Sequence, residues 1–142
     1  MRAARKFINI VRYYMLASIV LYGWLVWRLP STSTPNASLF RVITILALSM
    51  AIIVFAVWRI RVLPAGRTLT SRPNDAGALF RWRQGYLITY VFSQAIALYG
   101  VVLHFMGNPL LRVLPFFIAA FVLMLVLRPQ PPAPEFPPDA KG

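Results

Sequence analysis

Four long apolar stretches, separated by shorter polar and basic segments, dominate the pattern of hydrophobic and polar positions along this chain. They run from about residue 13 to 29, 39 to 58, 86 to 106 and 109 to 127. A helix of about 20 apolar residues crosses the roughly 30 Å hydrocarbon core of a bilayer, so each stretch has the length of a membrane span. None of them alternates polar with apolar residues, as the strands of a membrane barrel do. The pattern therefore predicts transmembrane helices.

Composition favours a membrane protein over a soluble one. Hydrophobic residues make up 59% of the chain, and charged residues make up 13%, where soluble domains carry about 25%. No Asp or Glu lies within any of the four stretches. We therefore expect an all-α integral membrane protein with four transmembrane helices in two hairpins.

The net charge of +12 does not change the predicted fold, but the positions of the basic residues predict how the helices are oriented in the membrane. Of the 15 Lys and Arg residues, Arg28, Arg41 and Arg112 lie on one side of the membrane, and all the others lie on the side that holds both termini. Because basic residues collect on the cytoplasmic side, both termini are expected to be cytoplasmic in a plasma membrane, the inner membrane in a bacterium. No fold or motif typical of nucleic-acid recognition accompanies the charge, so no nucleic-acid partner is expected.

Three segments outside the spans have their own character. Residues 1–12 form a basic amphipathic N-terminus, in which Arg2, Arg5, Asn9 and Arg12 share one helical stripe that would meet anionic lipid headgroups. Residues 129–142 form a proline-rich tail that favours an extended polyproline II conformation.

The third segment, residues 59–85, is an arginine-rich cytoplasmic connection. Its prolines and glycines predict irregular structure. Six arginines face only one acidic residue, Asp75, so we expect them to contact lipid headgroups or an acidic partner. They are Arg59, Arg61, Arg67, Arg72, Arg81 and Arg83.

The third span carries the polar pattern most open to a functional interpretation. Tyr90, Gln94 and His104 lie on one seam of the helix by their spacing. Beside that seam, small residues repeat at every fourth position, a spacing that lets transmembrane helices approach closely. They are Gly85, Thr89, Ser93 and Ala97, and they predict a packing helix. Its partner is either the second span, where Ala47 and Ala51 form a matching small pair, or another protein.

Gln94 and His104 each allow a structural and a functional interpretation. An amide near mid-membrane is costly without a hydrogen-bond partner, so Gln94 is expected either to bond a neighbouring helix or to contact an ion, a quinone or a partner's charged residue. His104 is the only histidine, and the chain has no cysteine. A single imidazole without carboxylate or thiolate neighbours does not build a metal site, so no metal or other cofactor is expected, although a proton relay or haem ligation remains an alternative for His104.

The sequence contains no pair of carboxylates in a span, no nucleophile and base set, and no phosphate-binding glycine loop. An enzyme is therefore not expected. The favoured hypothesis is a non-enzymatic accessory, assembly or oligomerising component of a membrane complex, with a membrane-protein partner or self-association. The alternatives are a protein that translocates protons or other ions and a subunit that binds quinone or lipid.

The segment Ser93-Gln94-Ala95-Ile96-Ala97-Leu98-Tyr99-Gly100 with its aliphatic continuation to Asn108-Pro109 resembles the carboxylate-bearing helix of the proteolipid c subunit of rotary ATPases. The resemblance covers residues 93–109 and implies ion translocation by a ring of helices. Gln94 occupies the position of the ion-carrying carboxylate and cannot ionise, so proton carriage by this residue is not implied. The chain as a whole is similar to small four-span bacterial membrane proteins.

Overall fold

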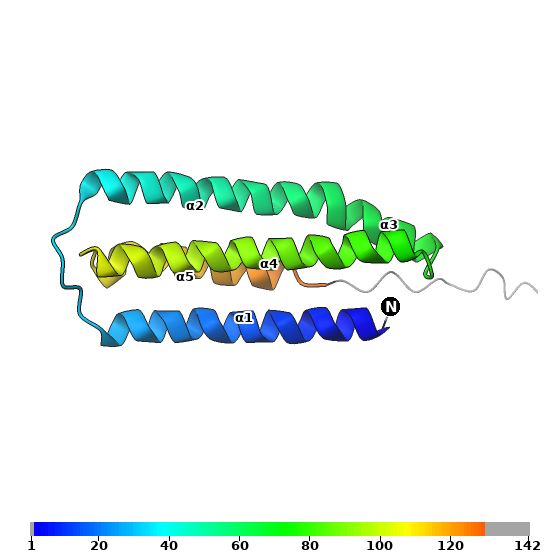
Figure 1. Cartoon of the computed structure of the whole chain (residues 1–142), viewed down its shortest axis with the longest axis horizontal. Helices are drawn as coiled ribbons and strands as arrows, with labels where there is room; N and C mark the ends of the chain where they lie inside the picture. Colours follow the sequence, from blue (N-terminus) through cyan, green and yellow to red (C-terminus); the bar gives the residue numbers. More distant parts are fainter. Residues whose placement is uncertain (1, 130–142) are drawn as a thin grey trace, which may run out of the picture.

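The computed structural model describes residues 2–129 and is helical over most of that length, with no strand among these residues. Its elements are α1 (Arg2–Arg28), α2 (Ala37–Val57), a π-helical turn η1 (Trp58–Val62), α3 (Leu63–Ser71), α4 (Ala76–Phe105) and α5 (Leu110–Val126) (Figure 1). The predicted all-α fold is confirmed. The proline-rich tail lies outside the described residues, apart from Pro129.

Three helical stretches are long and apolar enough to cross a membrane, namely Ala3–Arg28, Ala37–Ser71 and Ala76–Phe105. The fourth predicted span corresponds to α5, an apolar helix of 17 residues. At 1.5 Å per residue, α5 is about 25 Å long, close to the thickness of the hydrocarbon core and much shorter than its neighbours.

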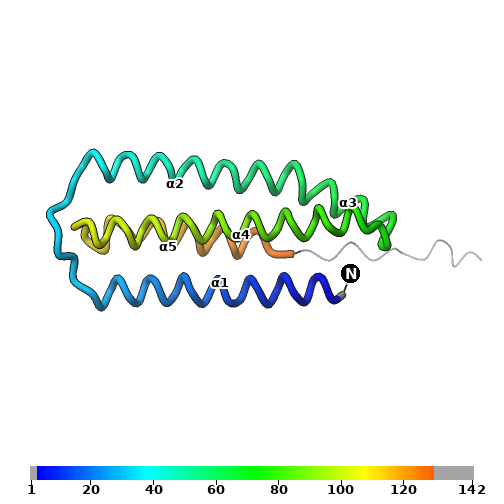
Figure 2. Tube along the Cα trace, in the orientation of Figure 1, coloured from blue at the N-terminus to red at the C-terminus, as the bar shows by residue number. Residues whose placement is uncertain are grey.

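Helix α4 forms the centre of the bundle. It packs against α1, α2, α3 and α5, and the traces of α1 and α2 run on opposite sides of it (Figures 1 and 2). Helix α5 packs against both α4 and α1. This central position is consistent with the buried polar residues of α4, namely Thr89, Ser93 and His104, because polar side chains of transmembrane helices face the interior of a bundle rather than lipid.

The structure corrects the prediction of an irregular loop over residues 59–85. The chain stays helical from α2 through η1 and α3 to Ser71, and α4 begins at Ala76, so only residues 72–75 lack helical structure. Pro64 has no N–H to donate, but it occupies the first turn of α3, where a helix tolerates this loss. The π-helical turn just before it widens the backbone where Pro64 interrupts the regular bonding.

Buried apolar residues hold this segment in a helix. Val62, Ala65 and Leu69 are 3%, 4% and 0% exposed, at the spacing of one helical face. The N-terminal part of α4, with the buried Trp82, packs against η1 and α3. The helical periodicity of the apolar residues therefore outweighs the local preference of proline and glycine for turns.

The helix ends are fixed by side chains that cap them. The Asn36 side chain accepts hydrogen bonds from the main-chain N–H groups of Ser38 and Leu39 at the start of α2. The Asp75 carboxylate accepts one from the N–H of Ala78 at the start of α4. Gly107 follows α4 with a positive φ of 95°, which allows the tight turn into α5.

Candidate functional site

The polar residues of the predicted seam on α4 contact neighbouring helices at three separate levels. Gln94 lies in the middle of the bundle, His104 at the end of α4, and Tyr90 near the end of α5. Gln94 and His104 are ten residues apart, which is about 15 Å along a helix. Apolar Ala97 and Val101 lie between them on the seam. The three side chains therefore form three contacts rather than one continuous polar site.

Gln94 joins α4 to α1. Its Nε2 donates a hydrogen bond of 2.7 Å to the hydroxyl oxygen of Ser18. The Ser18 hydroxyl in turn donates to the main-chain carbonyl of Met15 at 2.8 Å, which leaves its lone pair free to accept from Gln94. The Gln94 Oε1 atom is buried and has no hydrogen-bond partner among the described residues. The geometry thus shows the interhelical bond that the sequence allowed, with one acceptor left over.

His104 forms hydrogen bonds at the end of the bundle where α4 turns into α5. The side chain is 6% exposed, with Nε2 at 2.8 Å from the carbonyl oxygen of Leu29 and Nδ1 at 3.1 Å from that of Asn108. Both partners are acceptors, so a neutral imidazole donates to one of them and an imidazolium donates to both. Asn108 adds its own bond from Nδ2 to the carbonyl of Leu103 at 3.0 Å. His104 therefore ties the end of α1 to the turn between α4 and α5.

A third set of polar contacts closes the C-terminal end of α5. The last carbonyl groups of a helix have no partner within it, and α5 has no basic residue in its own last turn. Arg12 of α1 supplies one partner, since its Nε donates to the carbonyl of Met124 at 3.0 Å. Tyr90 and Tyr86 of α4 donate to the carbonyls of Leu127 at 3.3 Å and Arg128 at 3.2 Å.

The role of Arg12 in this cap does not follow from the local sequence. The sequence hints at this role only indirectly, because the apolar helix α5 has no basic residue in its own last turn. Tyr90 was singled out as part of the polar seam, and the structure places its hydroxyl on the cap rather than beside Gln94. The cap brings Arg12 and Tyr90 to the end of α5.

The small-residue row of α4 is used inside the bundle. Gly85 is buried, and Thr89, Ser93 and Ala97 are each 0% exposed. The two hydroxyls donate to main-chain carbonyls one turn earlier, so they need no outside partner. A Cβ atom on Gly85 would come within 2.6 Å of Val62 Cγ2, which shows how closely α4 approaches η1.

The matching pair on α2 lies beside an open groove. Ala47 is 6% exposed and Ala51 is half-buried. Both contribute to an apolar groove of about 270 Å³ between α2 and α5, whose floor is Ile96 of α4. The groove is lined by Thr44, Ala47, Leu48, Ala51, Ile96, Pro115, Phe116 and Ala119.

All six arginines between the second and third spans are exposed. They are Arg59, Arg61, Arg67, Arg72, Arg81 and Arg83. Within residues 2–129 the only carboxylate side chain belongs to Asp75, which already caps α4. Asp75 therefore carries the only side-chain carboxylate with which these cations could pair among the described residues, and the Arg83 guanidinium lies over the Phe7 ring instead.

Groups of His, Cys, Asp or Glu that are able to hold a metal ion do not occur in the part of the chain that the structure describes. Most of the hydrogen bonds described above join polar side chains to helix ends or to neighbouring helices, while Arg5 Nε, Gln94 Oε1 and Asn108 Oδ1 are buried without a partner among the described residues. No protein-family model, curated protein or solved structure matches this chain, so its function has to be inferred from its own residues.

Proposed function

We propose that this chain is a non-enzymatic, multi-pass protein of the plasma membrane that binds another transmembrane helix, as an accessory, assembly or oligomerising component of a membrane complex. In this proposal all four apolar helices cross the bilayer and both termini are cytoplasmic. The observation that carries it is the groove between α2 and α5.

The groove has the properties of a helix-binding surface. Helices associate in lipid mainly by close packing, because lipid tails are as apolar as leucine side chains and no hydrophobic driving force remains. Ala47, Ala51 and Ala119 have short side chains, so the backbone of a second helix is able to approach here. Leu48, which lines the groove and is 63% exposed, provides a larger apolar contact on α2.

The small-residue row of α4 is not available for this purpose, because it already packs inside the bundle. A lateral partner is therefore proposed to contact α2 and α5 and not α4. The partner is a transmembrane helix of a second copy or of another membrane protein.

The orientation is supported by the ends of the bundle. Arg12 of α1 bonds the last turn of α5, so the N-terminal part of α1 and the C-terminal end of α5 lie on the same side. Both termini lie on one side when the chain crosses the membrane an even number of times, as in the proposed arrangement of four crossings. The exposed arginines listed above collect at that end, which favours the cytoplasmic side for both termini.

A cysteine-free chain allows a direct test by single-cysteine crosslinking. Ala51→Cys is placed in the groove, and Val91→Cys, at a position of α4 that is 54% exposed and outside the groove, is the matched control. We expect oxidation in native membranes to yield a disulfide-linked dimer, or a disulfide to a cysteine of a co-purifying protein, for Ala51→Cys only. Equal crosslinking of both variants would show random collision.

A second variant separates a specific contact from the mere presence of the groove. Ala51→Leu fills the open space without burying a polar group, so the fold should remain intact while the partner helix is held away. We expect the complex sized in mild detergent to shift towards the monomer. A wild-type chain that elutes as a clean monomer, with no co-purifying protein, would contradict the proposed function.

A further inference from the structure

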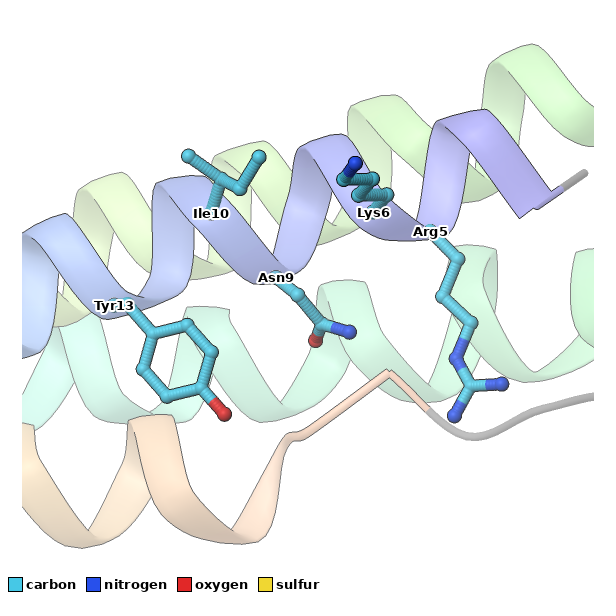
Figure 3. Close-up of a pocket in the computed structure, with 5 residues that line it drawn as sticks. All are labelled: Arg5, Lys6, Asn9, Ile10 and Tyr13. Carbon is cyan, nitrogen blue, oxygen red and sulfur yellow. The ribbon is translucent and has the colours of Figure 1, made fainter.

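A basic cleft on α1 has no role in helix packing. It has a volume of about 530 Å³ and is lined by Arg5, Lys6, Asn9, Ile10 and Tyr13. Figure 3 shows Arg5, Asn9 and Tyr13, which are spaced four residues apart, projecting from the same side of α1. Lys6 and Ile10 form the neighbouring row. The cleft therefore joins two cationic groups to an amide, a phenol and an apolar side chain.

The short length of α5 leaves this cleft open. Arg12 lies level with the end of α5, because its Nε bonds the carbonyl of Met124. Arg5 is seven residues earlier on α1, which is about 10 Å further along the helix axis. Beyond that level α1 continues past the end of α5, as Figure 1 shows. The cleft thus extends outward from the membrane border through the depth of the lipid headgroups.

The charge of the cleft has no counterpart in the described part of the chain. The Nε atom of Arg5 is buried and has no hydrogen-bond partner there. The one carboxylate in this region, Asp75, accepts its bond from the N–H of Ala78 at the start of α4. An anion from outside is needed to satisfy the cations of the cleft.

We propose that this cleft binds the headgroup of an anionic glycerophospholipid. Arg5 and Lys6 contact the phosphate, Asn9 and Tyr13 donate hydrogen bonds to phosphate or glycerol oxygens, and Ile10 lies along the start of an acyl chain. The site is distinct from the groove between α2 and α5, and it goes beyond the proposed function. It assigns one specific lipid position, in contrast to the diffuse attraction expected of the exposed arginines.

The choice of a lipid over a soluble anion rests on the position of the site. Tyr13 lies next to Arg12 at the membrane border, where tyrosine is typical of the interface. A free phosphate would leave the apolar Ile10 without a contact, whereas a phospholipid also places an acyl chain against it. A headgroup with a net negative charge is favoured over a zwitterionic one, because a choline group would bring a third cation to the site.

The test is a lipid titration of the full chain in mild detergent, followed by native mass spectrometry. Phosphatidylglycerol is compared with phosphatidylcholine, and inorganic phosphate is added as a competitor. The variant Arg5→Gln/Lys6→Gln removes the cleft cations. The matched control Arg59→Gln/Arg61→Gln removes the same charge from two exposed positions of η1.

We expect the wild type and the η1 variant to hold one equivalent of phosphatidylglycerol. With about 1 kcal/mol for each basic residue near the headgroups, the cleft variant should bind it about 30-fold more weakly. Retained elution volume and melting temperature without lipid show that the cleft variant is folded. Should it fail to fold, Asn9→Leu/Tyr13→Phe takes its place, with a loss of about 30-fold expected from two hydrogen bonds of about 1 kcal/mol each.

Four results would overturn the proposal. The cleft variant and the η1 variant would lose affinity for the lipid equally if the electrostatic attraction were diffuse. Phosphatidylcholine would bind as tightly as phosphatidylglycerol if the charge were irrelevant, and inorganic phosphate would displace the lipid if the site took free anions. Binding that appears only after Glu135 and Asp139 are replaced by Gln would show that the acidic tail, and not lipid, occupies the cleft.

Discussion

The two ends of the helix bundle differ in which polar side chains they bury and which they expose. At the end that holds the turn between α4 and α5, the only histidine is buried and both its ring nitrogens face carbonyl groups of the chain. At the other end, α1, α3 and α4 extend past α5, and α3 and α4 carry exposed arginines. The first, closed end buries its histidine and the following turn within the chain, although Arg28, Arg41 and Arg112 are exposed there. The second, open end exposes the six arginines between the second and third spans.

This difference separates residues that maintain the fold from residues that are available for partners. Groups already paired within the chain contribute stability, and their loss should be visible as a lower melting temperature. Unpaired cations at the membrane border contribute little to folding in detergent, where no anion meets them. Substitutions at the closed end should therefore affect stability most, and substitutions at the open end should affect lipid or partner binding most.

The largest loss is expected at Gly107 in the closed end. Alanine there would adopt an unfavourable positive φ, and its Cβ would meet main-chain atoms of the α1–α2 connection, 2.7 Å from Thr34 C and 2.8 Å from Pro35 N. Backbone atoms cannot move aside as a flexible side chain does. Gly107→Ala should destabilise the protein by about 2 to 4 kcal/mol, measured as a lower melting temperature in detergent.

Gly23→Ala is the control for this experiment, because a Cβ at Gly23 meets nothing within 4 Å. Alanine is favoured over glycine within a helix, so this variant should be as stable as the wild type or slightly more stable. Equal melting temperatures for the two alanine variants would show that the turn does not hold the α1–α2 connection closely.

A smaller loss is expected when the imidazole of His104 is removed. His104→Leu keeps a side chain of similar size but removes the hydrogen bond that the neutral ring donates to the carbonyl of Leu29 or of Asn108, which should cost about 1 to 2 kcal/mol. His104→Gln retains a donor and should fall between wild type and leucine. The measurement is again the melting temperature, and an unchanged value for leucine would argue that water or lipid replaces the imidazole without cost.

The long apolar helices could be predicted from the sequence, because a helix must contain about 20 apolar residues to cross the hydrocarbon core of a bilayer. Each predicted span falls on a helix, but α1 begins at Arg2 and α4 at Ala76, about ten residues before the predicted starts, and the second helical stretch continues to Ser71. The segment after Trp58 was misjudged because Pro64 and Gly66 suggested turns, while the buried face formed by Val62 and Leu69 becomes evident only with α4 packed against it.

The polar contacts show the same limit. Burial cost predicted that Gln94 needs a partner, but several hydroxyls were equally eligible, and only the packing of α1 on α4 selects Ser18. His104 was a candidate because it is unique, yet its carbonyl partners belong to segments far apart in sequence. The residue pairs depend on the level at which neighbouring helices meet, which no single helix encodes.

The smallest effect is expected for Arg12, a basic residue at the open end whose guanidinium is nevertheless bonded within the chain. It belongs to the basic N-terminal stripe, but its Nε is already engaged with the carbonyl of Met124 at the end of α5. A cation at a helix C-terminus contributes about 0.3 to 1 kcal/mol, so Arg12→Met should lower the melting temperature only slightly. Arg12→Lys retains the charge near those carbonyls and should lose less. Arg59→Met, at an exposed position of η1, is the matched control and should leave stability unchanged. If Arg12→Met and Arg59→Met behaved alike, the cap on α5 would contribute nothing, and Arg12 would belong with the cations that await an external anion.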